Sequence, residues 1–467
     1  MLNRLELREK EREFLAQESK KSPELFCEQT FVDNAELLDR FGIFIENQEK
    51  LPAGFLKFLP SDFIVEEVSQ SGDIFSVDYE NVFKEDDIIE DRPTIYATLV
   101  KCQMSTIEVV DELKEFLECE QKQIQYSGIK DKNAITSQKL SFRNISEIRL
   151  SKINSPFYFL RDVSGGNGVV SIGGIKGNRF IILVRTDKNF NSEDFLKKLE
   201  KIDKEGFYNF YYLQRFGTPR LSNYLWAVLI LKGKYKEAVE GFLTDVGERE
   251  MPFFKNLRQE IKKYLGDWKA IKKIISNFPT ILTNEIKVTS YLENNPTDYK
   301  GALSQISEQT TLWLYALSSF LFNKKLSEMI RNNKEISIKF PLFISQNQDD
   351  QLFYKDLLED MGVYPPLFKN FFSISNIILK ARQEKTRVKA EIRKCEIIKE
   401  GVIIDFILSK AVYATTFLSN FFNLTSGVAS EEISKEQIDL KKQLGYQSIQ
   451  ETLKYFDKVI VKKEENL

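Results

Sequence analysis

The hydrophobic pattern of this chain changes its period twice, and these changes constrain the fold more than any other feature. From Lys57 onward, apolar and β-branched residues mix with polar ones, as in partly exposed strands. Helical periodicity dominates from Leu221 to about Asn332, and strand-like sequence returns at 386–391 and 402–408. A helical segment inserted between two portions of one β-rich domain accounts for this order. We therefore expect an α+β fold.

Local signals place a turn at about residue 130. Ser105 and Glu108 have the spacing of a capping box, which predicts a helix running to about Glu118. A short strand follows, and Asp131 then lies in the turn after that strand. The apolar residues that recur at helical intervals are Ile107, Val110, Leu113 and Leu117.

Two further segments carry structural signals. Residues 169–172, the glycine pair 173–174 and residues 180–184 are typical of paired strands with a glycine turn. Residues 1 to about 50 are strongly charged and largely helical in pattern. Four apolar side chains of this N-terminal segment could dock on a core: Phe31, Leu37, Leu38 and Phe41.

Composition bounds the class of protein. At 467 residues the chain is too long for one ordinary core and is expected to form two domains with a small extension, and 42% hydrophobic residues provide material for their cores. A net charge of −2 does not exclude nucleic acid, since a basic patch on one face is enough for binding. The N-terminus has no apolar signal region, and the run 312–322 is too short to span a bilayer. We expect a soluble, cytoplasmic protein.

The chain contains no histidine, and this excludes several chemistries. A Ser-His-Asp or Cys-His nucleophile system is impossible, and so is an imidazole metal site. The four cysteines form no C-x-x-C pair, so a zinc ribbon or a redox dithiol is not expected. Carboxylates, amines and hydroxyls must therefore supply the chemistry.

One stretch, 126–138, combines the features of a reactive carboxylate. Asp131 stands between Lys130 and Lys132, and Gly128 allows a tight turn before it. Nearby positive charge favours the ionised form of a carboxyl group. An ionised carboxylate suits a nucleophile or a base better than a proton donor. The small and polar residues after it, 134–138, fit a packed, hydrogen-bonded site.

The stretch 126–138 resembles the G-x-K-D-x-x-A-x-T-x-Q signature of the TruD family of transfer-RNA pseudouridine synthases, in which the aspartate is catalytic. Residues 56–65 resemble the family's K-x-x-P-x-D-F-x-V strand, and 177–180 its G-N-R-F hairpin. Residues 209–217 resemble N-Y-F-G-x-Q-R-F-G, and 412–418 the late G-S-[FY]-A-T segment. These motifs stand in family order from about residue 54 to about 424.

The resemblance implies roles for individual residues. Asp131 is the catalytic carboxylate, and Lys57 is a supporting cation beside it. The chain departs from the family at Tyr212, which replaces a glycine, and at 419–420, where Ser-Asn replaces Arg-Glu. The residues implied to line the target base are Phe63, Asn209, Tyr211 and Tyr413.

Basic residues near the late motifs are candidates for RNA contacts. Residues 380–394 hold seven basic and two acidic side chains. By itself such a run is most simply a solvated face, but beside a nucleotide site it becomes a candidate phosphate-binding patch. The residues predicted to contact the RNA backbone are Arg215, Arg387, Lys389 and Arg393.

The resemblance also implies the architecture: a pseudouridine synthase core with a mixed, largely antiparallel sheet flanked by helices, and an inserted, mainly helical TRUD domain. The predicted division is a charged helical extension (1–50), the first part of the catalytic domain (51–217), the insertion (218–375), the second part of the catalytic domain (376–430) and a helical tail (431–467).

The implied activity is the isomerisation of a uridine in tRNA, at position 13 of the D arm, without cofactor or metal. Asp131 would attack the ribose or remove a ribose proton, and the sequence leaves both routes open. Two alternatives also remain. One is an inactive RNA-binding protein or chaperone of the same fold. The other is a carboxylate-based metal-dependent nuclease, although the main acidic run, 78–91, is more typical of a loop.

Overall fold

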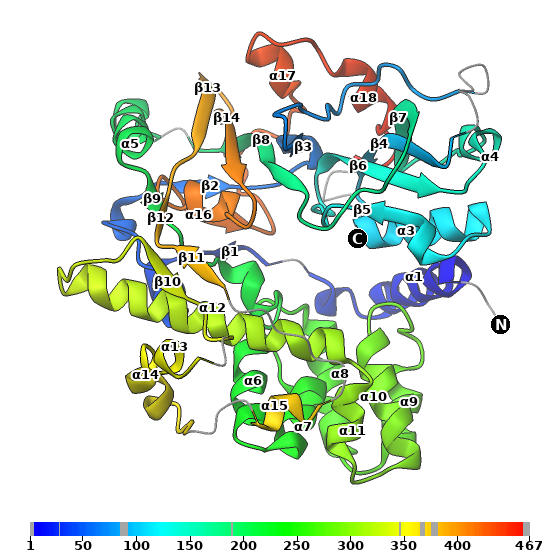
Figure 1. Ribbon diagram of the computed structural model, residues 1–467, viewed down its shortest axis with the longest axis vertical. Helices are drawn as coiled ribbons and strands as arrows, with labels where there is room; N and C mark the ends of the chain where they lie inside the picture. Colours follow the sequence, from blue (N-terminus) through cyan, green and yellow to red (C-terminus); the bar gives the residue numbers. More distant parts are fainter. Residues whose placement is uncertain are drawn as a thin grey trace.

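The structure is a computed structural model that describes residues 4–27, 29–84, 92–187, 190–344, 347–364, 369–374 and 382–460. In Figure 1 the strands of the main sheet occupy the upper half of the molecule, and most of the helices occupy the lower half. Within the described ranges, no helix combines the length and apolarity needed to cross a membrane.

The main sheet has 11 strands in the part of the chain that is described. Its pairs β3–β6 and β15–β2 are parallel, and its other pairs are antiparallel. The mixed, largely antiparallel sheet of the predicted α+β fold is therefore confirmed. The strand order is β1 (Phe31–Val32), β15 (Asn423–Ser426), β2 (Ala53–Phe55), β8 (Ile175–Arg185), β3 (Phe63–Ser69), β6 (Ile135–Arg143), β4 (Thr94–Cys102) and β7 (Tyr158–Gly166), with β14 (Gly401–Ser409) joining β13 (Glu391–Ile398) to β8, and β5 (Ile124–Tyr126) beside β6.

Helices flank the sheet and form the lower half of the molecule (Figure 1). Those outside the long helical segment are α1 (Arg4–Lys21), α2 (Ala35–Arg40), α3 (Thr106–Leu117), α4 (Glu147–Ser151), α5 (Ser192–Glu205), α16 (Ala414–Leu418), α17 (Leu440–Gln443) and α18 (Gln450–Tyr455). Those within it are α6 (Asn223–Leu231), α7 (Tyr235–Thr244), α8 (Pro252–Lys263), α9 (Trp268–Ile275), α10 (Thr283–Asn294), α11 (Tyr299–Ser304), α12 (Ser307–Arg331), α13 (Gln348–Leu352), α14 (Lys355–Asp360) and α15 (Lys369–Phe372).

The central strands bury both of their faces. In β8, Ile182 belongs to the largest hydrophobic core, whereas its neighbour Ile181 belongs to a second core that includes Leu440 of α17 and Leu453 of α18. Successive side chains of a strand point to opposite faces, so each of these strands must be apolar at consecutive positions. This explains the continuous apolar run at 180–184.

The helical segment leaves and rejoins the sheet region at adjacent strands. β9 (Phe207–Tyr208) pairs with β12 (Arg387–Val388), so Tyr208 lies opposite Arg387. A second pair, β10 (Lys339–Pro341) with β11 (Gln383–Lys385), lies beside this junction in sequence. Neighbouring entry and exit points are what an inserted segment needs. The exact domain boundaries given above remain predictions.

The N-terminal segment is helical over α1, as its pattern predicts, but it also contributes a strand. Phe31 of β1 pairs with Ser426 of β15 and so extends the main sheet. Leu37 and Leu38 of α2 are buried in the largest core, as expected. Charge patterning alone did not indicate this strand, because its partner stands almost 400 residues later in the sequence.

One predicted strand is wrong. Residues 169–172 form no strand, and the strand that precedes β8 in the sequence is β7, which pairs with β4 rather than with β8. The side chains of Ile172 and Val169 are 91% and 42% exposed. The apolar run therefore has no sheet face against which it could be buried, and it forms a loop instead.

A buried ion pair joins three parts of the fold. Asp62, just before β3, accepts hydrogen bonds from Nε and Nη2 of Arg185 in β8 at 2.8 and 2.7 Å. Both side chains are completely buried. Arg185 also donates to the backbone carbonyls of Ser434 and Glu436 at 2.7 and 2.8 Å, which anchors the C-terminal segment. Loss of the Arg185 guanidinium would therefore leave the buried Asp62 carboxylate without its cation.

We expect Arg185→Met to lower the free energy of unfolding by about 3–5 kcal/mol, because it leaves the Asp62 carboxylate buried without a counter-charge. Arg149→Met is the matched control. It breaks an exposed pair with Glu118, and such pairs contribute about 1 kcal/mol at most. Urea denaturation of the two variants measures the difference. Equal losses of stability would contradict this account of the buried pair.

Candidate active site

Asp131 lies in the loop between β5 and β6 and contacts the lysine that the sequence assigned to it. Lys57 precedes β3, the parallel neighbour of β6, so the two loops open at the same edge of the sheet. Lys57 Nζ donates to Asp131 Oδ1 at 2.7 Å. The Asp131 side chain is 46% exposed and that of Lys57 is 25% exposed. The carboxylate is therefore paired and still accessible to a substrate.

The backbone and a ring hold Lys57 in place. Its φ of 56° lies in the left-handed region, which residues other than glycine seldom adopt. Its Nζ also lies 4.1 Å from the ring centroid of Phe63, a cation–π contact. Phe63 is only 2% exposed. In this structure Phe63 supports the lysine from beneath and has little free ring surface.

The neighbours of Asp131 in sequence point away from it, as alternation along an extended chain predicts. Lys130 Nζ pairs with Glu67 at 2.8 Å. Lys132 Nζ pairs with Glu108 at 3.0 Å. Of the two, only Lys130 is buried. The cation that contacts the reactive carboxylate therefore comes from a distant segment and not from the K-D-K triplet.

The polar residues after Asp131 anchor its loop. Gln138 Nε2 donates to the Gly128 carbonyl at 2.9 Å. Thr106 Oγ1 donates to Gln138 Oε1 at 2.8 Å and accepts from the Lys130 backbone N–H at 3.0 Å. These two buried side chains hold the turn from both sides. The role of Gln138 in this structure is therefore to anchor the loop that carries Asp131.

Sequence reasoning missed Lys101. This residue of β4 is completely buried, and its Nζ donates to the Asp131 backbone carbonyl at 2.5 Å. Burial lowers the pKa of Lys101 to about 7, although attraction to Asp131 partly opposes that shift. The sequence signal that could have indicated a buried lysine here is its position as a single charged residue within the apolar run of β4.

The charges around Asp131 determine its ionisation. Burial would raise the pKa of this carboxyl group, but the charge and hydrogen bond of Lys57 outweigh it, with smaller contributions from Lys101 and Lys130. The net effect is a pKa below the ordinary value for aspartate. Asp131 is therefore an anion at neutral pH, as expected for a nucleophile or a base.

Lys101 makes the stability depend on pH in a specific direction. Its pKa is about 7 when folded and is the ordinary 10.5 when unfolded, so between these values the unfolded chain binds more protons. We expect the free energy of unfolding of the wild type to rise with pH in this window, relative to Lys101→Met, by about 5 kcal/mol at most. Denaturation of both proteins at pH 7, 8 and 9 tests this. Parallel stability curves would contradict it.

A second group of residues places aromatic rings beside an arginine. Tyr413, before α16, packs edge-on against Tyr211 with ring centroids 6.1 Å apart. The Arg215 guanidinium carbon lies 5.2 Å from the Tyr211 ring and 5.9 Å from the Tyr413 ring. Arg215 Nε is buried and has no hydrogen-bond partner in the described part of the chain. Tyr211 is buried, whereas Tyr413 is partly exposed and presents the accessible ring.

Two distant residues fix the backbone that carries Tyr211. Asn323 of α12 accepts from the Tyr211 backbone N–H at 2.9 Å and donates to its carbonyl at 2.8 Å. Tyr212, the residue that departs from the family glycine, is buried and donates through its hydroxyl to Asp33 at 2.7 Å. Asp33 also pairs with Arg249 of the helical segment. The bulky Tyr212 is thus accommodated by partners that the sequence motif does not contain.

The lysine–carboxylate pair and the aromatic group rest on one core. Phe63 packs edge-on against Phe180 at 6.2 Å, and Phe180 stacks on Phe406 at 5.4 Å. Phe406 contacts Phe417 of α16 at 4.5 Å, and α16 begins directly after Tyr413. This continuous row of rings gives the two groups a common rigid base.

Asn209 and two of the predicted phosphate-binding residues line one cavity, whereas Arg393 lies elsewhere. Asn209 is buried, and its Nδ2 donates to the Lys385 carbonyl at 3.0 Å, so it ties β9 to the returning chain. Arg387 and Lys389 line a cavity of about 650 Å³. Arg393 is exposed on β13 and does not line this cavity. We call this cavity the groove. Its lining residues are Glu205, Asn209, Lys339, Gln383, Glu384, Lys385, Arg387, Val388, Lys389, Ser409, Lys410 and Val412.

No metal-binding cluster of three or more cysteine or acidic side chains occurs in the described ranges. The predicted acidic loop is described only up to residue 84, where residues 78–84 form neither helix nor strand, and residues 85–91 lie outside the described part. Asp78 pairs with Lys441 at 2.8 Å. The nuclease alternative thus gains no support from the described residues.

Comparison with known proteins gives the same family as the motifs. The model of a family described as tRNA pseudouridine synthase D (TruD) matches residues 47–341. The chain is 28% identical over 240 residues to a probable tRNA pseudouridine synthase D of Methanosarcina acetivorans, covering 50% of this chain and 53% of that protein. It is 27% identical over 315 residues to a probable tRNA pseudouridine synthase D 2 of Methanocaldococcus jannaschii, covering 66% and 67%.

A longer match and a solved structure complete the comparison. The tRNA pseudouridine synthase D of Aquifex aeolicus is 23% identical over 384 residues, covering 74% of this chain and 95% of that protein. The crystal structure of a tRNA pseudouridine synthase D from Methanosarcina mazei, itself described as putative, superposes with a TM-score of 0.59 at 21% identity, covering 83% of this chain and 98% of that one. The chain thus spans about half the length of the first relative named and shares its fold with a solved structure.

Proposed function

Because this chain belongs to the TruD family of tRNA pseudouridine synthases, we propose that it converts a uridine in tRNA to pseudouridine, at position 13 of the D arm. The observation that carries this proposal is the contact between Lys57 and Asp131 at 2.7 Å. It combines an accessible carboxylate with a lowered pKa. An enzyme that needs an anionic nucleophile or base at neutral pH requires this combination.

The reaction begins with extraction of a stacked base, which costs a few kcal/mol. Stacking on an aromatic ring returns about 1–3 kcal/mol per base, and Tyr413 is the ring with accessible surface. Tyr211 supports that ring from its edge. Arg215 packs its guanidinium against both rings, and we assign it a contact to the RNA through the part of the side chain that is exposed.

Asp131 then acts on the ribose of the extruded nucleotide. It attacks the sugar or removes a ribose proton, and both routes need the ionised carboxylate. The bond between uracil N1 and ribose C1′ breaks, the base rotates, and C5 of uracil forms the new bond to C1′. C5 then loses its proton and N1 gains one, so the product is an isomer of the substrate. Lys57 keeps the carboxylate charged and oriented, and Lys101 holds the backbone carbonyl of the same residue. Every step assigned here uses side chains of this protein.

The groove supports binding of the RNA backbone. It brings cationic side chains from three separate segments, at 339, 385–389 and 410, next to Val412, the neighbour of Tyr413. Neutralising phosphates dominates affinity for nucleic acid. We assign phosphate contacts to Arg387 and Lys389, and we keep Arg393 as a candidate on the edge of the sheet. The cytoplasmic location expected from the sequence stays a prediction.

The deciding experiment incubates the purified protein with two tRNA transcripts, one with uridine and one with cytidine at position 13, in the presence of EDTA. We expect pseudouridine at position 13 of the first transcript only. Binding without any pseudouridine would favour the inactive RNA-binding alternative. Cleavage of RNA that EDTA abolishes would favour the nuclease. Modification at another uridine would overturn the assignment to position 13.

A further inference from the structure

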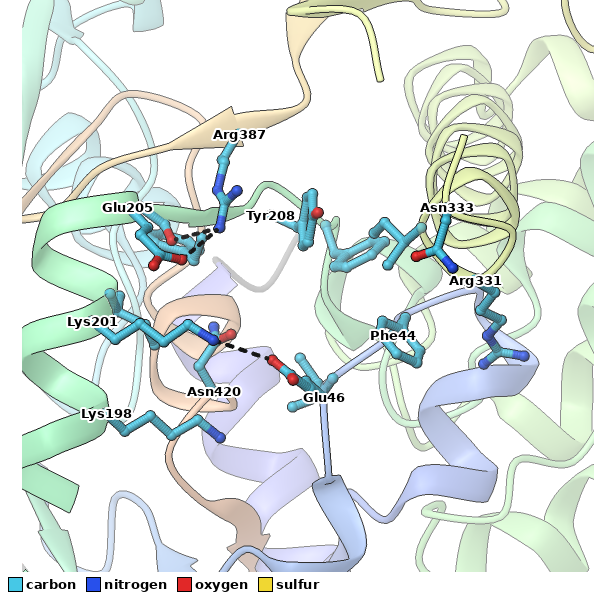
Figure 2. Close-up of a pocket in the computed structure, with 16 residues that line it drawn as sticks. Phe44, Glu46, Lys198, Lys201, Glu205, Tyr208, Arg331, Asn333, Arg387 and Asn420 are labelled. Carbon is cyan, nitrogen blue, oxygen red and sulfur yellow. Dashed lines mark hydrogen bonds and ion pairs between the residues drawn. The ribbon is translucent and has the colours of Figure 1, made fainter. Parts of the chain in front are cut away.

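A cavity of about 610 Å³ lies outside the site of Asp131. It is formed by α5, the loop at 44–46, the end of α12 and Arg387 of β12, as Figure 2 shows. Its volume is typical of sites that hold a small molecule or one nucleotide. Neither Asp131 nor Tyr413 lines it, so the proposed reaction makes no use of it.

Cations outnumber acids on its walls. Lys198 and Lys201 of α5 lie on one side of the space and Arg331 on the other, with Arg387 above, beside Glu205 (Figure 2). The acids are engaged only loosely: Glu46 lies 3.6 Å from Lys201, and Glu205 lies 3.7 Å from Arg387. Lys198 is half-buried and forms no ion pair within the described residues. Arg331 pairs with Asp39, which does not line the cavity. An anion placed here would therefore be held mainly by Lys198 and Lys201 of α5.

Two partly exposed rings accompany the cations. The Arg387 guanidinium carbon lies 4.8 Å from the Tyr208 ring. The Arg331 guanidinium carbon lies 5.3 Å from the Phe44 ring. Both rings line the cavity and are labelled in Figure 2. Flat aromatic and guanidinium surfaces are the platforms on which proteins stack unpaired bases.

The cavity is connected to the groove of the proposed function. Arg387 and Glu205 line both spaces. From Arg387 the groove continues past Lys389 and Lys410 to Val412, beside Tyr413. One cation-lined surface therefore runs from the proposed base-stacking ring to the cavity in Figure 2. A free small molecule would not need this connection, but a nucleic-acid strand would.

We propose that this cavity is a second RNA-binding site, which accepts an unpaired nucleotide of the substrate at a distance from the target uridine. Its phosphate lies against Lys198 and Lys201, and its base lies against the Tyr208 and Arg387 surface. The proposal rests on the proposed function only in that the substrate is RNA. It adds a recognition element that the catalytic group does not contain.

The test compares two double variants of one helix. Lys198→Glu/Lys201→Glu reverses the charges in the cavity, whereas Lys197→Glu/Lys204→Glu reverses two charges of α5 that do not line it. Both variants change the net charge equally. With a tRNA transcript at 0.1 M salt, we expect the first variant to bind about tenfold more weakly and to lose about two from the slope of log affinity against log salt. We expect the second to bind within about twofold of the wild type.

Variants of Tyr208 provide a second, independent test of the proposed binding site. Tyr208→Ala should weaken binding of the same transcript about fivefold or more, since stacking is lost, and Tyr208→Phe should restore it, since the ring remains. Equal effects of the two α5 variants, or equal affinities of Tyr208→Ala and Tyr208→Phe, would overturn the proposal. Thermal unfolding of each variant shows whether it is folded.

These readouts are separate from turnover. If tRNA is bound at the cavity but no pseudouridine forms, the proposed function fails and the second binding site stands. If pseudouridine forms and the cavity variants bind like their controls, the second binding site fails and the proposed function stands.

Discussion

We expect Asp131→Asn to abolish pseudouridine formation, with a fall in rate of at least about 10⁴-fold, and to change the affinity for tRNA by less than about twofold. The amide has the shape of the carboxylate and can still accept a hydrogen bond from Lys57, but it carries no charge and is a poor nucleophile or base. Single-turnover formation of pseudouridine and filter binding of the same transcript measure the two quantities.

Asp203→Asn is the control for this variant. Asp203 is exposed on α5, outside both the catalytic pair and the cavities, and its replacement makes the same change in charge. We expect wild-type rate and affinity. Loss of tRNA binding by Asp131→Asn together with residual turnover would show that the carboxylate serves binding, and the proposed mechanism would be wrong.

We expect Lys57→Met to lower kcat/KM at pH 7 about 10²-fold and to move the acidic limb of the pH profile to higher pH. The charge and hydrogen bond of Lys57 are the main causes that lower the pKa of Asp131, while burial acts in the opposite direction. Without the lysine, the pKa of Asp131 rises. Activity that requires the carboxylate is lost as pH falls through this pKa, so the loss begins at a higher pH. The measurement is kcat/KM from pH 5 to pH 9.

Lys132→Met separates this effect from a general loss of positive charge. Lys132 is the immediate neighbour of Asp131 in sequence, but its ammonium pairs with Glu108. We expect its removal to move the acidic limb much less than removal of Lys57 does. A profile that shifts equally in both variants would mean that the ion pair between Lys57 and Asp131 does not control the reactive group.

Much of the fold could be predicted from local pattern. The capping box at Ser105 is formed, and α3 begins at Thr106. β3, β14 and the helical segment also lie where the periodicity places them. These features depend on residues close together in sequence, where one face must be buried. The failure at 169–172 has the same cause, since an apolar run forms a strand only when a sheet face is there to cover it.

In the candidate site, too, the features that depend on near neighbours in sequence could be predicted, and the long-range contacts could not. Asp131 is recognisable because glycine, lysines and small polar residues surround it within one short stretch. Its contact with Lys57 followed only from the resemblance, since 74 residues separate the two. Asn323 and Tyr211 are 112 residues apart, and Tyr212 and Asp33 are 179 apart. The local pattern of residues along the sequence contains no information about pairs that are this far apart.

The sequence by itself determined which carboxylate is the candidate for the reaction, the exclusion of histidine chemistry, and an α+β fold with a helical segment between strands, because these depend on composition and near neighbours. Only the tertiary structure decided which cation contacts that carboxylate, why Lys101 is buried beneath it, and that α5, α12 and β12 enclose a cation-lined cavity. Strand register and helix packing bring these groups together, and both are set by contacts over long distances in sequence.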